Sequence, residues 1–242
     1  MEVVTQRCYL RNYYKCMNFI KSYCRIVPGH VWLNGEAYFK STRNPFVMND
    51  FFSAIYEHAR TDYRKFYKMD ALSKLGFLAS ELLLAGSDRE QPKPDMGIVF
   101  FNRSSSLAAD MNYQKTIQHK EDFYPSPADF VYTLPNIVAG EIAIRNKIYG
   151  ETVFYTKPNF SGDTVSRIIN DAMSASGIKF ALTGWIEVDV HNNMVDCLMM
   201  LCTPKQGKTL KNSPSLPAGF EGVYAGENII LDAFNILDLY KY

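Results

Sequence analysis

The sequence is poor in residues that would mark a metal centre or a disulfide framework. Its cysteines are odd in number and show no C-x-x-C spacing: Cys8, Cys16, Cys24, Cys197 and Cys202. Its histidines are isolated from one another: His30, His58, His119 and His191. We therefore expect free, buried thiols, and neither a disulfide scaffold, a metal site nor a cofactor.

Long apolar runs and a strong net charge are also absent. No uninterrupted apolar stretch reaches the ~18 residues of a membrane span. The formal net charge is only +1, so no basic field favours nucleic acid. Residues 1–16 lack the apolar core of a signal peptide, and Met17 is an alternative start that would make them an upstream extension. These features predict a cytoplasmic protein without a membrane span.

The composition is that of an ordinary globular protein, with 47% hydrophobic and 21% charged residues. A length of 242 residues can bury a substantial core within one domain. We expect a single domain over residues 1–242, with a long loop at 203–227 and a C-terminal segment, 228–242, that docks onto the body.

Strand patterns alternate with helix patterns along the chain. The alternation of Phe19–Val27 predicts a strand that ends at Pro28-Gly29, and Val31–Phe39 is a second aromatic-rich segment. Asn49-Asp50 are expected to cap a helix that begins near Phe51. Leucines recurring every three and four residues over Met69–Leu84 predict a helix that stops at Gly86.

The second half of the chain continues this alternation. The continuous apolar run Gly97–Phe101 is typical of a strand buried on both faces. A helix is expected over Phe130–Ile144, a strand over Thr152–Thr156 and a helix over Gly162–Ser176 with Ser161 as its cap. Phe180–Val190 is one long strand or a strand pair, with Gly184 interrupting its row of side chains, and Met194–Cys202 is a further buried strand. This order predicts an α/β layered structure with a mixed sheet.

Several motifs in order resemble the first half of the beta-ketoacyl synthase family. The segments are Tyr67–Ser73 at the opening of an early helix, Gly97–Phe100 in the next strand, Leu134–Arg145 with the turn Lys147–Glu151, and Ala181–Glu187 in a later strand. The resemblance covers roughly Met69 to Glu187. It implies a thiolase-like fold, with layered helices around a mixed β-sheet, corresponding to the N-terminal half of a ketosynthase.

The family's nucleophilic cysteine lies at a sharp elbow, in the pattern Thr-Ala-Cys-x-x-Gly. Aligning Gly150 and Gly162 with the family glycines without a gap places Lys157–Gly162 at this elbow and Asn159 at the cysteine position. A condensing synthase needs a thiolate that accepts the acyl chain, and an amide cannot form a thioester. The family's second half, which carries two active-site histidines and a lysine, has no room in this sequence. We therefore predict no catalytic residue and a pseudoenzyme.

The resemblance also suggests where a partner or an acyl chain would lie. Apolar residues of the region before the elbow are most often core, but in the family this region lines the dimer interface and the acyl tunnel. The candidate residues for an acyl cavity or dimer interface are Met111, Phe130, Tyr132, Leu134, Asn136 and Phe160. The cluster Arg60, Arg64, Lys65 and Lys68 is either a solvated helix face or a surface for an acidic carrier protein.

The leading functional hypothesis is a non-catalytic subunit resembling a chain-length factor. The resemblance implies that it pairs with a catalytic ketosynthase and acyl carrier protein in fatty-acid or aryl-polyene-type polyketide synthesis, as a heterodimer or homodimer joined edge to edge through the sheets. The alternatives are a malonyl-carrier-protein decarboxylase that uses the amide at the elbow, and a stand-alone half-domain that binds acyl chains.

Overall fold

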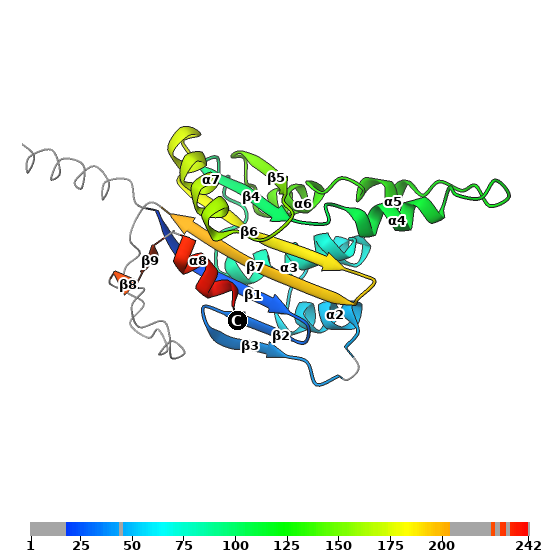
Figure 1. The fold of residues 1–242 in the computed structure, drawn as a ribbon, viewed down its shortest axis with the longest axis horizontal. Helices are drawn as coiled ribbons and strands as arrows, with labels where there is room; N and C mark the ends of the chain where they lie inside the picture. Colours follow the sequence, from blue (N-terminus) through cyan, green and yellow to red (C-terminus); the bar gives the residue numbers. More distant parts are fainter. Residues whose placement is uncertain (1–17, 44–45, 204–223, 226–227, 231–232, 242) are drawn as a thin grey trace, which may run out of the picture.

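A mixed sheet with helices on both faces forms the body of the protein (Figure 1). The computed structural model describes residues 18–43, 46–203, 224–225, 228–230 and 233–241. The sheet has the strand order β3-β2-β1-β7-β6-β4-β5, and β9 additionally pairs with β1. β4 runs parallel to β5 and β6, whereas the other pairings are antiparallel. The predicted α/β architecture with a mixed sheet is confirmed.

The strands are β1 (Phe19–Val27), β2 (His30–Leu33), β3 (Glu36–Lys40), β4 (Met96–Asn102), β5 (Thr152–Thr156), β6 (Phe180–Asp189), β7 (Met194–Thr203), β8 (Tyr224–Ala225) and β9 (Asn228–Ile230). The helices are α2 (Met48–His58), the 3-10 helix η1 (Arg64–Lys68), α3 (Ala71–Leu83), α4 (Leu107–Lys115), α5 (Pro127–Val131), α6 (Ile137–Asn146), α7 (Gly162–Ala175) and α8 (Ala233–Tyr240). Among the described residues, no helix is long and apolar enough to span a membrane.

The central strands are buried on both faces, which is why their sequences are continuously apolar. In β7, Cys197, Met199 and Leu201 pack into the core beneath α2, α3 and α6, while Leu198 and Met200 pack into the core beneath α7 and α8. All residues of β4 are buried, so this strand is covered on both faces, as its apolar run predicts. The sheet therefore separates two hydrophobic cores.

Gly184 marks a close approach between β6 and β7. Its φ is +155°, and a Cβ at this position would lie 1.9 Å from the carbonyl oxygen of Leu198. Any larger residue would push the strands apart. β6 nevertheless continues through it, so the predicted segment is one long strand and not a strand pair.

Helix α3 is present as predicted, but it begins at Ala71, two residues after the predicted start at Met69. The carboxylate of Asp70 accepts hydrogen bonds from the backbone N–H groups of Leu72 (3.3 Å) and Ser73 (3.0 Å), which caps the helix. Burial raises the pKa of the Asp70 carboxyl above its ordinary value, although these hydrogen bonds act in the opposite direction. Gly86 follows the helix with a φ of +80°, which a stop signal requires.

Other predicted boundaries were wrong. Helix α2 begins at Met48 with Val47 as its N-cap, so Asn49-Asp50 lie inside its first turn and do not cap it. The predicted helix Phe130–Ile144 is two helices, because α5 ends at Val131 and α6 starts at Ile137. Pro135 explains this break, since proline offers no N–H and disfavours helical backbone at the preceding residue.

Two further segments differ from their predictions. Val31–Phe39 is a hairpin, because Asn34 and Gly35 both take positive φ and turn β2 into β3. The predicted loop 203–227 is not all loop, since Thr203 ends β7 and Tyr224–Ala225 form β8. Most of that segment, like residues 1–16, lies outside the described residues.

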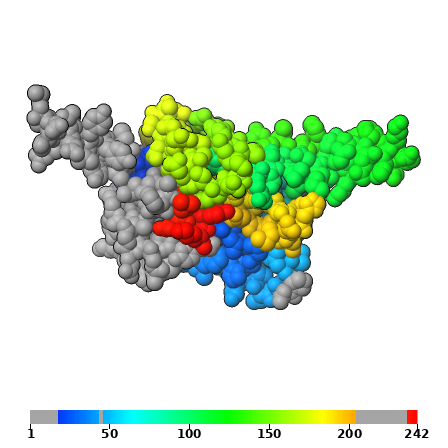
Figure 2. Space-filling model, viewed as in Figure 1, coloured from blue at the N-terminus to red at the C-terminus, as the bar shows by residue number. Residues whose placement is uncertain are grey.

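Two peripheral elements frame the functional region. Helices α4 and α5 with their connection form an arm, residues 107–136, which projects from one end of the body (Figures 1 and 2). Helix α8 packs against α7 through Ile236 and Leu239, both fully buried. The elbow of interest lies between β5 and α7.

Candidate functional site

The elbow is the turn that carries the chain from β5 into α7. Pro158 and Asn159 form a bend after the strand, and Asn159 is exposed. Ser161 then caps α7, because its hydroxyl accepts a hydrogen bond from the Thr164 N–H at 3.2 Å. The predicted cap is confirmed, and it fixes the direction in which the chain enters the helix.

A cleft of about 450 Å³ opens beside this elbow. We call it the elbow cleft; its aromatic walls are Phe160 and Trp185, with Tyr240 from α8. Phe160 stacks on Tyr240 with ring centroids 3.9 Å apart, and it meets Trp185 edge to face at 5.9 Å. The indole N–H of Trp185 is buried and has no hydrogen-bond partner among the residues that the structure describes. The C-terminal helix thus contributes a wall to a cleft whose other walls lie far earlier in the sequence.

Glu187 forms the floor of the elbow cleft and is 6% exposed. Its carboxylate accepts hydrogen bonds from the backbone N–H groups of Arg103 (2.6 Å) and Ser104 (3.2 Å), and from the Ser104 hydroxyl. This buried carboxylate therefore holds the turn that follows β4 against β6. It is engaged in structure and is not free to act as a base.

A second polar network holds Tyr240 in place. The Asp196 carboxylate accepts hydrogen bonds from the Arg25 guanidinium and from the Tyr240 hydroxyl. The Arg25 guanidinium also lies over the Tyr240 ring, 4.7 Å from its centroid. Burial, together with the hydrogen bond to Asp196, raises the pKa of the Tyr240 hydroxyl far above its ordinary value. Tyr240 is therefore a neutral hydrogen-bond donor.

No nucleophilic thiol is available within the described part of the chain. Cys24, Cys197 and Cys202 are free and fully buried, as predicted for thiols in core strands. Burial raises the pKa of Cys24 to about 12, and it also raises the pKa values of Cys197 and Cys202 well above those of ordinary thiols. A thiol must be deprotonated to attack, so these three are inert packing groups. The described residues also contain no group of three or more potential metal ligands.

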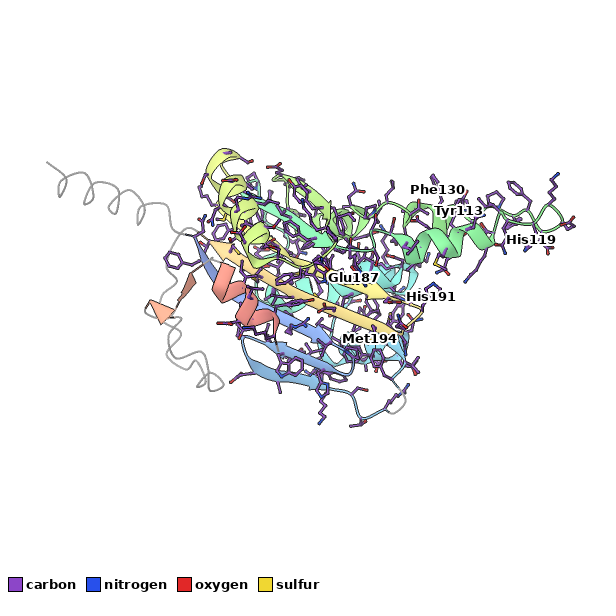
Figure 3. All side chains as sticks on the ribbon, in the orientation of Figure 1. Tyr113, His119, Phe130, Glu187, His191 and Met194 are labelled. Carbon is purple, nitrogen blue, oxygen red and sulfur yellow. The ribbon has the colours of Figure 1, made fainter. Side chains whose placement is uncertain are left out.

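The structure divides the predicted site residues into two groups. Asn159 and Phe160 line the elbow cleft, whereas Met111, Phe130, Leu134 and Asn136 belong to the arm and its junction with α6. Figure 3 shows Phe130 beside Tyr113 on the arm, well away from Glu187. Phe130 and Leu134 are each 55% exposed, so they are not core residues of this chain.

Tyr132 belongs to a second cleft, of about 390 Å³, at the base of the arm. This arm-base cleft lies between the arm, the starts of α2 and α3, and the β6–β7 turn. Tyr132 is 8% exposed. Burial and the nearby carboxylates of Glu141 and Asp70 raise its pKa to about 12. The six candidate residues therefore do not converge on one site.

Sequence reasoning missed the network of Arg25, Asp196 and Tyr240. Arg25 and Asp196 are 171 residues apart in the chain, and no local pattern connects them with the C-terminal helix. In the sequence, Glu187 stands out only as the last residue of the motif Ala181–Glu187. Its role in holding the turn at Arg103 required the pairing of β4 with β6.

This architecture is the ketosynthase-like, thiolase-type fold. Among solved structures, the ishigamide ketosynthase/chain length factor is similar at 16% sequence identity with a TM-score of 0.53. A complex of the ketosynthase ApeO with its chain length factor ApeC from Xenorhabdus doucetiae is similar at 14% identity with a TM-score of 0.50. The chain aligns over 82% and 79% of its own length, and it spans 64% of the first matched chain and 80% of the second. No protein-family model and no curated protein matches the sequence.

Proposed function

We propose that the protein is a non-catalytic, ketosynthase-like subunit that resembles a chain-length factor and pairs with a catalytic ketosynthase. The observation that carries this proposal is Asn159 at the elbow between β5 and α7. An amide there can donate and accept hydrogen bonds but cannot carry an acyl chain as a thioester. The buried thiols of β1 and β7 cannot replace it.

The edge of the sheet supports pairing with a partner. Within the described strands β5 pairs only with β4, so its other edge is free to form hydrogen bonds with another chain. Its residues are half-buried or exposed. We propose that this edge joins the partner's sheet, as the resemblance to ketosynthases implies.

The arm supplies a second surface for the partner. Large apolar side chains that are between 46% and 83% exposed follow one another along it: Leu107, Phe123, Tyr124, Phe130, Val131 and Leu134. Exposed apolar side chains gathered on one projection mark an interaction surface more often than single exposed residues do. We propose that the arm contacts the partner ketosynthase and contributes to the wall of an acyl cavity.

A carrier protein would be a further partner in fatty-acid or polyketide synthesis. Lys65 is occupied, because it forms an ion pair with Glu141 at 2.7 Å. Arg60 and Arg64 are exposed beside it and form no ion pair among the described residues, so they are the better candidates for contact with an acidic carrier protein. These reactions take place in the cytoplasm, which is the compartment we propose.

Co-expression with a catalytic ketosynthase tests the pairing. We expect one heterodimer on gel filtration. The double variant Phe130→Asp, Leu134→Asp should lose it while remaining folded, because both side chains are exposed. Met194→Asp is the matched control, since Met194 is 49% exposed but lies at the start of β7. Two separate monomers from the unaltered proteins would contradict the proposal, and self-association alone would favour a homodimeric half-domain.

Activity assays of Asn159 variants test whether the elbow takes part in a reaction. Asn159→Cys should not gain condensing activity in the isolated chain, because a thiol alone lacks the donors and proton-transfer groups of a synthase. Release of carbon dioxide from malonyl carrier protein by the unaltered chain, abolished in Asn159→Ala, would instead establish the decarboxylase alternative.

A further inference from the structure

The arm-base cleft collects basic and amide side chains from separate elements. Lys68 ends η1, Lys74 lies in the second turn of α3, and both line the cleft. Asn49 of α2 and Asn112 of α4 line it from the other sides. No element of the proposed pairing with a ketosynthase uses these groups.

Like most lysines in the described part of the chain, these two have no carboxylate partner at ion-pair distance. Within the described residues neither forms an ion pair, whereas the neighbouring Lys65 binds Glu141 at 2.7 Å. The ammonium group of Lys74 lies 5.9 Å from the centroid of the Phe66 ring, and its side chain is half-buried. Burial lowers the pKa of Lys74, although Asp70 acts in the opposite direction. An anion in the cleft would offset the cost of keeping this charge partly out of water.

The carboxylates and amides of the cleft differ in whether they already make hydrogen bonds within the protein. Asp70 is occupied by the N–H groups that it caps at the start of α3. Asn193 is also occupied, since its amide accepts from the Met48 N–H at 3.3 Å and donates to the Phe46 carbonyl. The carboxylate of Asp129 and the side-chain oxygen of Asn49 accept no hydrogen bond within the described residues.

The cleft offers several donors without a protein acceptor. The amide nitrogens of Asn49 and Asn112 make no hydrogen bond within the described residues, and two ammonium groups add up to three N–H donors each. A ligand with several acceptor oxygens would bind these donors, although the carboxylates of Asp70 and Asp129 line the same cleft. Phosphate has such oxygens, and lysine binds it as a point charge.

We propose that the arm-base cleft is a binding site for a phosphate group, recognised by Lys68 and Lys74 with the amides of Asn49 and Asn112. The ligand is free phosphate or a small phosphomonoester, which the cleft volume of about 390 Å³ admits. Occupancy would connect the base of the arm to α3 through one anion. The site stands whether or not the protein pairs with a ketosynthase.

Calorimetric titration of the full-length chain tests this site. One series of titrations uses inorganic phosphate and a second series uses glycerol 3-phosphate. Lys74→Met should weaken binding of both about ten-fold, equivalent to roughly 1.4 kcal/mol. Lys68→Met should weaken it several-fold, and Lys74→Arg should retain most of it because the charge remains. Asp129→Asn should strengthen binding by removing one of the two carboxylates that line the cleft. A lower dissociation constant for glycerol 3-phosphate than for inorganic phosphate identifies a phosphomonoester as the ligand. Equal dissociation constants identify free phosphate.

Lys21→Met is the matched control, because Lys21 is an exposed lysine of β1 outside the cleft. We expect it to bind as the unaltered chain does. The proposal is overturned if neither phosphate compound binds, if Lys21→Met weakens binding as much as Lys74→Met, or if the Lys68→Met, Lys74→Met double variant binds normally while its thermal unfolding midpoint is unchanged.

Discussion

Replacing Asp196 by alanine should destabilise the protein by about 2–4 kcal/mol. Asp196 accepts hydrogen bonds from the buried guanidinium of Arg25 and from the hydroxyl of Tyr240. Removing one member of a buried ion pair costs roughly 3–5 kcal/mol, and a hydrogen bond to a charged group contributes about 1.5–3 kcal/mol. Two features place the expected loss at the lower end of this range.

The first feature is that the Asp196 side chain is 28% exposed, so water can replace part of the lost contact. The second is its neighbour across the strands, because Glu187 lies directly opposite Asp196 in the β6–β7 register. Like charges in this position repel, so the substitution also relieves some strain. Arg25 keeps its hydrogen bond to the Cys197 carbonyl at 3.1 Å.

Urea denaturation followed by far-ultraviolet circular dichroism measures this loss. Tyr240→Phe should cost only about 1–2 kcal/mol, because it removes the hydroxyl and leaves the stacking on Phe160. The control is Asp238→Ala, whose carboxylate pairs with the exposed Lys241 and should contribute less than about 1 kcal/mol. If Asp196→Ala were no more destabilising than Asp238→Ala, the network of Arg25, Asp196 and Tyr240 would not hold the elbow cleft together.

Three further outcomes are expected. Ser161→Ala should lower the free energy of unfolding by about 1 kcal/mol through loss of the α7 cap, and Ser161→Asn, checked in the same urea titration, should restore most of it. With Cys8 and Cys16 changed to serine, the native protein should not react with a thiol reagent until urea is added, because Cys24, Cys197 and Cys202 are fully buried; rapid native labelling would contradict this. Hydrogen bonds from Asn192 and His191 lower the pKa of the half-buried Asp189 carboxyl from its ordinary value, so the stability it gives the β6–β7 turn is present above that ordinary value and lost as the pH falls through the lowered pKa. Asn192→Ala should move the carboxyl titration seen by NMR upward, and an unmoved titration would show that the amide does not lower the pKa.

Local patterns predicted an element correctly where residues within the same segment are sufficient to form it. The apolar run of β4, the leucine spacing of α3 and Ser161 ahead of α7 each gave the correct element. These signals act over a few residues, through side-chain alternation, helical repeat or a single cap. The start of α2 was missed because Val47 provides no capping side chain that a sequence pattern could identify.

The candidate site was harder to predict because residue type alone does not reveal burial on a given face. Phe130, Leu134 and Tyr132 have similar side chains in nearly consecutive positions. The break at Pro135 and the packing of the arm leave the first two 55% exposed and place Tyr132 in a cleft beneath. Exposed fraction depends on which elements pack together, and that information is not local.

The class of fold and the side chains of the turn between β5 and α7 could be read from the sequence. Asn159 lies in that turn, and an amide cannot form a thioester in any conformation. The tertiary structure alone decided what surrounds that position. Tyr240 reaches Phe160 only because α8 packs on α7, and Arg25 meets Asp196 only because β1 pairs with β7. Contacts between residues so far apart in the chain arise from sheet pairing and core burial, so they leave no trace in a local pattern.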